Sequence, residues 1–209
     1  MKQSKFILVL LPLLFAGCIG QKKNNPDSAF YYLSPVKDLS DIGRVVLLEL
    51  ANESPYPKIS KDVTDSLYGA IQKRQVFGLS VIRQDDPRWQ NLQLDKFDNY
   101  TMEQLSAMHK SLKADAVLRG TVTRYEPFPH LVIGLRLEML DLSDGKLLWA
   151  LEQIWDAADK STQNRVRDYY KTSLLPGTDS LEIGLGTVSS LRFIEFVTYE
   201  AAKTIKPKR

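Results

Sequence analysis

The chain has 209 residues, a length typical of one domain, and 44% of them are hydrophobic, which is enough for a packed core. It carries 28 lysines and arginines against 25 aspartates and glutamates, a formal net charge of +3. This balance provides no bulk attraction to nucleic acid, so we expect no nucleic-acid partner.

Cysteine and histidine are scarce. The single cysteine is Cys18, and the only histidines are His109 and His130. One thiol excludes disulfides, redox pairs and thiolate metal sites from the residues that follow it. The chain also lacks a GxSxG elbow, an HExxH pair, a P-loop and a GxGxxG turn. We therefore predict no metal, no cofactor and no catalytic residues, and hence a protein that is not an enzyme.

The N-terminus has the pattern of a lipoprotein signal. Residues 1–5 are basic and residues 6–15, FILVLLPLLF, are apolar. This run is shorter than the ~20 residues of a membrane-spanning helix and suits a signal peptide. The following LFAGC resembles a lipobox, with small residues before the cysteine. We predict a signal peptide over 1–17, cleavage between Gly17 and Cys18, and lipidation of Cys18. An ordinary secretory signal with an incidental cysteine is the alternative.

The residues after Cys18 suggest a location and a tether. By resemblance to proteobacterial lipoproteins, Ile19 in place of aspartate implies the outer membrane, with the domain facing the periplasm. Residues 21–28, QKKNNPDS, lack apolar side chains and are typical of a flexible linker. We assign the lipidated cysteine and tether to residues 18–35 and one periplasmic domain to residues 36–206.

The first half of the domain alternates strands and helices. Residues 44–50 are a continuous apolar run, as in a strand buried on both faces. Ser60 is expected to cap the next helix. Residues 79–82 predict a second strand, and residues 85–99 a polar loop. Thr101 and Gln104 have the spacing of a capping box. The buried stripe of that second helix is predicted to be Met102, Leu105, Met108 and Leu112.

The second half begins with three strands. Residues 116–125 predict one strand, and residues 131–141 alternate between apolar and polar side chains. A hairpin turn over 143–146 leads to a partner strand over 147–155. Helices are expected over 162–172 and 189–205, with a loop over 175–186. The order β-α-β-α-β-β-β-α-α predicts a single α/β domain with a mixed β-sheet and helices packed against it.

Aromatic side chains in loops are the candidates for partner recognition, because loops commonly carry binding residues. These candidates are Trp89, Tyr125, Phe128 and His130. For Phe128, packing over an edge of the core is the interpretation that we favour, and partner contact is the alternative. Three arginines fall on predicted strands, where they either form a row for an acidic partner or lipid head group, or mark the solvent face. They are Arg119, Arg124 and Arg136.

The segments RVVLLELANESPYPKISKDVTDSLYGAIQKR, ADAVLRGTVTRYEPF and LRLEMLDLSDGKLLWALEQIWD carry a family resemblance. Over about residues 44–158 the chain resembles the lipoprotein superfamily that shares the fold of the TolB N-terminal domain. This superfamily includes the curli-secretion lipoprotein and lipoprotein activators of penicillin-binding proteins. The resemblance implies a non-enzymatic domain that binds a protein partner in envelope assembly, secretion or cell-wall synthesis regulation, with a homo-oligomer possible.

Two other functions remain open. Residues 29–35, AFYYLSP, resemble the YYL segment of auxiliary lipoproteins of ABC-type lipid-transport systems. Such a lipid carrier would have an elongated apolar groove. An envelope hydrolase is the alternative from another class, and it would need a cleft of convergent titratable groups with shifted pKa values.

Overall fold

The computed structural model describes residues 30–94, 100–173 and 186–207. The strands are β1 (Tyr31–Leu33), β2 (Arg44–Leu48), β3 (Ala51–Asn52), β4 (Gly78–Ile82), β5 (Ala116–Glu126), β6 (Val132–Asp141) and β7 (Leu147–Asp156). The helices are the 3-10 turn η1 (Leu39–Asp41), α1 (Ile59–Gln72), α2 (Pro87–Asn91), α3 (Met102–Leu112), α4 (Lys160–Ser173) and α6 (Ser190–Lys203). The predicted α/β class is confirmed.

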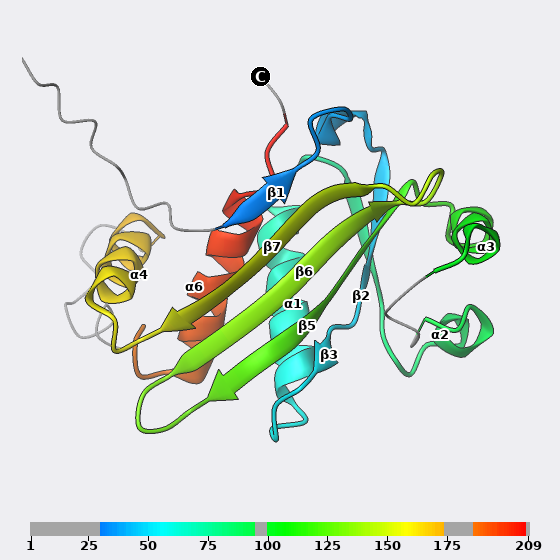
Figure 1. The fold of residues 1–209 in the computed structure, drawn as a ribbon. Coiled ribbons are helices and arrows are strands. Elements are labelled where there is room, and N and C mark those ends of the chain that lie inside the picture. Colours follow the sequence, from blue (N-terminus) through cyan, green and yellow to red (C-terminus); the bar gives the residue numbers. More distant parts are fainter. Residues whose placement is uncertain (1–29, 95–99, 174–185, 208–209) are drawn as a thin grey trace, which may run out of the picture.

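The strands form one mixed sheet (Figure 1). The order is β1-β7-β6-β5-β2-β4, and the short β3 also pairs with β5, giving seven strands. β2 is parallel to β4 and to β5, whereas β5, β6, β7 and β1 pair antiparallel in turn. The two parallel pairs are joined through helical connections, and the antiparallel hairpin β6–β7 is closed by a short turn, as predicted.

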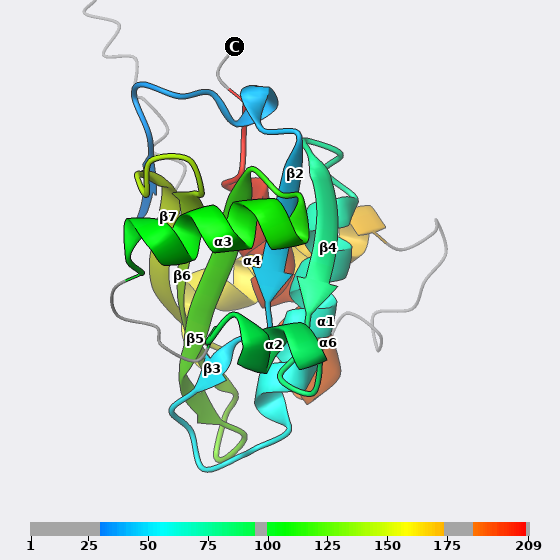
Figure 2. The same ribbon diagram turned by 90° about the vertical axis from the view of Figure 1, so that its right-hand side faces the viewer.

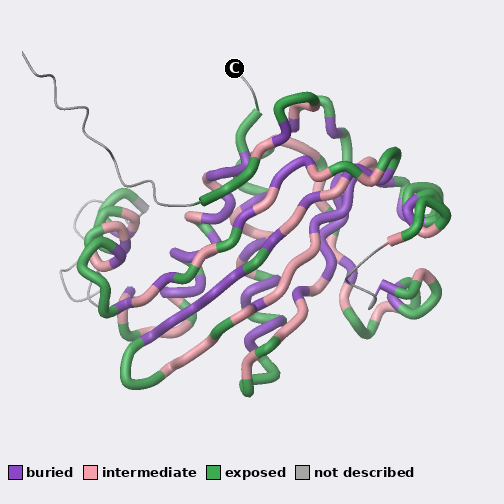
Figure 3. Tube along the Cα trace, viewed as in Figure 1, coloured by how far each residue is buried: buried purple, intermediate pink, exposed green. Residues whose placement is uncertain are grey.

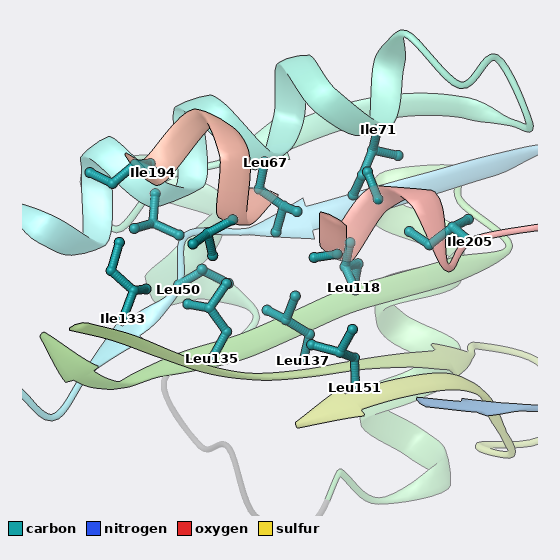
Figure 4. Close-up of a cluster of buried hydrophobic side chains, with 14 of the residues drawn as sticks. Leu50, Leu67, Ile71, Leu118, Ile133, Leu135, Leu137, Leu151, Ile194 and Ile205 are labelled. Atoms are coloured by element: carbon teal, nitrogen blue, oxygen red, sulfur yellow. The ribbon is translucent and has the colours of Figure 1, made fainter. Parts of the chain in front are cut away.

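Helices cover the sheet unevenly. α1 and α6 pack together behind the sheet and enclose the larger core, part of which Figure 4 shows. α2 and α3 lie on the opposite side near β2 and β4 (Figure 2) and enclose a smaller core. β2 is therefore buried on both faces, as its apolar run predicts. Val45 and Leu47 enter the larger core, while Val46 and Leu48 enter the smaller one.

The apolar face predicted for residues 131–139 is also confirmed. Burial alternates only in the second half of β6, since Val132 and Gly134 on the other face are buried too, and Figure 3 shows the first half of β6 as continuously buried. Its inward side chains are at most 3% exposed; they are Leu131, Ile133, Leu135, Leu137 and Met139. The opposite face of β5, β6 and β7 faces the viewer in Figure 1 and is not covered by any helix of the described residues. This uncovered region is called the open sheet face below.

The predicted tether extends too far along the chain. Tyr31–Leu33 pairs with Trp149–Leu151 as the edge strand β1, and the Ser34 amide donates to the Leu148 carbonyl at 2.8 Å. The folded part thus includes residues before position 36. A three-residue strand has too little local pattern to be predicted, because its pairing depends on the exposed edge of β7. Residues 1–29 and most of the expected loop 175–186 lie outside the described residues.

Two helix predictions are wrong in detail. Lys58, not Ser60, is the N-cap of α1, and the Ser60 hydroxyl is instead buried and donates to the Leu50 carbonyl. Met102 is 53% exposed and does not belong to the buried stripe of α3, which starts at Leu105. The capping box of α3 is confirmed, with reciprocal bonds between Thr101 and Gln104.

Candidate partner-binding surface

Trp89 is not part of any surface. It lies in α2, within the segment expected to be a polar loop, and is only 6% exposed. The Asp86 carboxylate accepts from the Arg88 amide at 2.9 Å and starts this short helix, which turns the indole into the smaller core. As a partner-contact residue, Trp89 is therefore excluded by its burial. The polar residues around Trp89 do not predict this burial, because most of the smaller core comes from segments distant in sequence.

The other aromatic candidates lie at the end of β5 and in the loop to β6. We call Tyr56, Tyr125, Phe128 and His130 the β5–β6 end. Phe128 is 84% exposed, so the favoured interpretation, in which it packs over a core edge, is wrong. Tyr125 packs edge-to-face against Tyr56, with ring centroids 5.2 Å apart and planes at 89°. Tyr56 was not a sequence candidate, although it stands between two prolines in a turn segment.

Charged groups beside these aromatics are paired. The His130 Nε2 lies 3.3 Å from the Asp156 Oδ1. The Arg124 Nε donates to the Glu126 Oε1 at 2.7 Å, and this hydrogen bond lowers the pKa of Glu126 and raises the pKa of Arg124. Both partners of the Arg124–Glu126 pair are exposed to solvent, so the β5–β6 end is an aromatic surface with an exposed ion pair at its rim.

The arginines on the open sheet face do not form a free cationic row. Arg119 donates to Glu138 at 2.9 Å, and Arg136 donates to Glu152 at 3.1 Å. Each of these pairs joins residues directly opposite one another in the β-ladder. The open sheet face is therefore a neutralised solvent face, and its arginines are not a preformed site for acidic partners.

A hollow lies between α1, α4 and α6. It is lined by Tyr170, Arg192 and Glu195, among others. The Tyr170 hydroxyl donates to the Arg192 carbonyl at 2.6 Å, and burial raises the pKa of Tyr170, which keeps the phenol protonated. This hydroxyl therefore serves as a structural donor. Across residues 30–94, 100–173 and 186–207, histidine, cysteine, aspartate and glutamate nowhere gather in threes as metal ligands would.

No helix in the part of the chain that the structure describes combines the length and apolarity required to cross a membrane.

No protein-family model and no curated protein matches the chain. Solved structures are similar to it at low identity. The PelC dodecamer from Paraburkholderia phytofirmans has 17% identity, covers 61% of this chain and 80% of its own, and has a TM-score of 0.43. The lipoprotein GNA1162 from Neisseria meningitidis has 15% identity, coverages of 66% and 99%, and a TM-score of 0.42. The LpoB C-terminal domain from Salmonella enterica has 16% identity, coverages of 59% and 87%, and a TM-score of 0.41.

Proposed function

We propose that this chain is a non-enzymatic lipoprotein, anchored through Cys18 to the outer membrane, whose periplasmic domain binds a protein of the cell envelope. The anchor is supported by the sequence, since the only cysteine follows an apolar segment and two small residues. Two or more acyl chains hold a protein stably on a membrane. The partner then serves envelope assembly, secretion or the regulation of cell-wall synthesis, as the family resemblance implies.

The observation that supports partner binding is the exposure of Phe128 at the β5–β6 end. Its ring is 84% exposed, and it follows by three residues Tyr125, which packs against Tyr56. Aromatic side chains are enriched in the buried centres of protein interfaces, because they remove a large apolar area from water with little loss of conformational freedom. Tyr125 belongs to a central strand, so this surface is held on a rigid support.

The test replaces the Phe128 side chain in the full chain, expressed in cells. Envelopes containing wild type, Phe128→Ser or the control Val36→Ser are crosslinked, and the captured proteins are identified by mass spectrometry. Val36 is 86% exposed and lies outside the β5–β6 end, so it controls for the loss of an exposed apolar side chain. We expect Phe128→Ser to lower partner recovery at least about tenfold, as for a central interface residue. Equal recovery with both variants, or no envelope protein with wild type, would refute the proposal.

The second candidate function is that of an auxiliary lipoprotein in ABC-type lipid transport. The favouring observation is that Tyr31–Leu33, in the segment that resembles those proteins, is built into the sheet as β1. The same crosslinking experiment separates the two functions. Recovery of a membrane permease and its ATPase with wild type would support the transport role, and recovery of a cell-wall or secretion protein would support the first.

A further inference from the structure

β4 forms one edge of the sheet, and its hydrogen bonds show which of its backbone groups are unused. The Gly78 amide donates to the Gly43 carbonyl at 2.9 Å, and the Ile82 carbonyl accepts from the Glu49 amide at 2.9 Å. Alternate residues of a strand direct their amide and carbonyl groups to the same side. Residues 78, 80 and 82 therefore bond to β2, and the groups of Leu79 and Val81 point away from the sheet.

These outward groups have no hydrogen-bond partner among the described residues. Leu79 and Val81 offer two donors and two acceptors on an edge whose five residues are in continuous register with β2. Sheet edges are usually protected from further pairing by charged side chains, proline, bulges or a covering segment. The sequence GLSVI of β4 contains neither a charge nor a proline, and the pairing with β2 is unbroken.

We propose that the edge of β4 pairs antiparallel with the β4 of a second copy of this chain, about a two-fold axis at Ser80. The arrangement of the free groups is self-complementary under this symmetry. The amide and carbonyl of Leu79 meet those of the second copy's Val81, and the reverse pair forms equally, so all four groups on each edge are satisfied. Ser80 is exposed and directly faces its own counterpart.

The charges of α1 fit the same arrangement. Asp65 pairs with Arg83, which places the first half of α1 beside the carboxyl end of β4. The charged groups at this end are three cations, Lys58, Lys61 and Arg83, and four carboxylates, Glu49, Asp62, Asp65 and Asp85, which leaves one net negative charge. Lys73 and Arg74 follow the helix at its other end. Antiparallel pairing brings the acidic end of each α1 to the same side as the basic end of the other. Parallel pairing would bring like charges together.

The first test is a disulfide across the two-fold axis in the full chain in its own membrane. Residues that face each other without hydrogen bonds in an antiparallel pair have Cα atoms about 4.5 Å apart, within reach of a disulfide. Under mild oxidation we expect Ser80→Cys to give a covalent dimer on non-reducing electrophoresis. The control Ser106→Cys, on the exposed face of α3, should give none. No dimer with Ser80→Cys, or equal amounts with both variants, would overturn the proposal.

Wild type is run beside these variants, because an unacylated Cys18 would itself crosslink. A dimer in the wild-type lane would contradict the lipid anchor and leave the comparison between Ser80→Cys and Ser106→Cys to decide the pairing.

The second test places a charge at position 80, because the two copies of this side chain meet at the proposed two-fold axis. Differently tagged copies of Ser80→Lys and Ser80→Glu are co-expressed in pairs and isolated through one tag. We expect the mixed pair to co-isolate at least tenfold more than either like-charged pair. A lysine or glutamate at an exposed edge is harmless to the single copy. Equal co-isolation of like and mixed pairs would refute the two-fold arrangement.

Discussion

Asp141 holds the N-terminal segment against the hairpin between β6 and β7. Its carboxylate is 2% exposed, accepts from the Ser143 amide at 2.8 Å and from the Ser143 hydroxyl at 2.6 Å, and forms an ion pair with Lys37. Burial pushes the pKa of Asp141 upward, but the hydrogen bonds from Lys37 and Ser143 outweigh it, and the pKa is lowered. Folding therefore favours the ionised carboxylate.

The Asp141→Asn variant is predicted to lose stability in a pH-dependent way. A lowered folded-state pKa stabilises the protein above the unfolded pKa of about 3.9, and this contribution disappears as the pH falls through the folded value. At pH 7 we expect a loss of about 1–3 kcal/mol in the free energy of unfolding, measured by urea denaturation. The deficit should shrink below about pH 4. The exposed control Asp144→Asn should lose at most about 1 kcal/mol. A deficit that is independent of pH would contradict the role of the charge.

At the residue scale, Trp89 and Phe128 show that the local sequence does not decide whether an aromatic side chain is buried or exposed. Both stand in polar or proline-rich segments, and the same argument selected both as surface candidates. Trp89 is buried and Phe128 is exposed. The difference depends on whether distant apolar residues lie over the ring. Trp89 shares the smaller core with Leu105, Met108 and Leu112 of α3, and no local pattern around Trp89 encodes their approach.

At the scale of elements, the pairing of β5 with β6 depends on the absence of a side chain at Gly120. A Cβ atom there would lie 2.4 Å from the Arg136 carbonyl oxygen and 2.5 Å from Leu137 Cδ2. Gly69 in α1 has the opposite surroundings, because an added Cβ would meet nothing within 4 Å.

The same substitution should therefore have opposite effects at these two glycines. Gly120→Ala forces backbone and core atoms apart and is expected to cost about 1–3 kcal/mol of unfolding free energy. Gly69→Ala lowers the backbone entropy of the unfolded chain at this position. It is expected to raise the free energy of unfolding by about 0.5–1 kcal/mol. Thermal and urea unfolding of both variants provide the measurement. Destabilisation by Gly69→Ala would show that the space above it is filled in solution.

Helices and strands were predictable where a regular spacing of apolar residues, or a capping motif, marked the element in the sequence itself. The alternation of residues 131–139 places its apolar side chains in the larger core, and the capping box at Thr101 starts α3. Ser60 departs from this because α1 already begins at Ile59, so Ser60 lies within the first turn, where its hydroxyl donates to the Leu50 carbonyl of the preceding connection. A serine near a helix start can satisfy either its own helix or a neighbouring segment, and only the tertiary arrangement selects between them.

At the scale of the whole molecule, the proposed lipid anchor would decide where the domain acts. The Cys18→Ala variant is predicted to leave the outer-membrane fraction, because no thiol remains to accept lipid. Intact mass spectrometry of wild type should show an acylated N-terminal cysteine, and Ser34→Ala, within the folded segment, should be acylated equally. An unmodified thiol at position 18, or a mature N-terminus elsewhere, would contradict the predicted signal peptide and the localisation.

The sequence alone determined the α/β class, the mixed sheet with its β6–β7 hairpin, the capping box of α3 and the chemistry available at Cys18, because periodicity, turn residues and residue type are local properties. The tertiary structure decided that β1 joins the sheet, that Trp89 is buried, that the strand arginines are neutralised and that β4 retains an open edge. These features depend on contacts between segments far apart in the chain. Their energies come from surfaces and hydrogen-bond groups that exist only once the sheet has assembled.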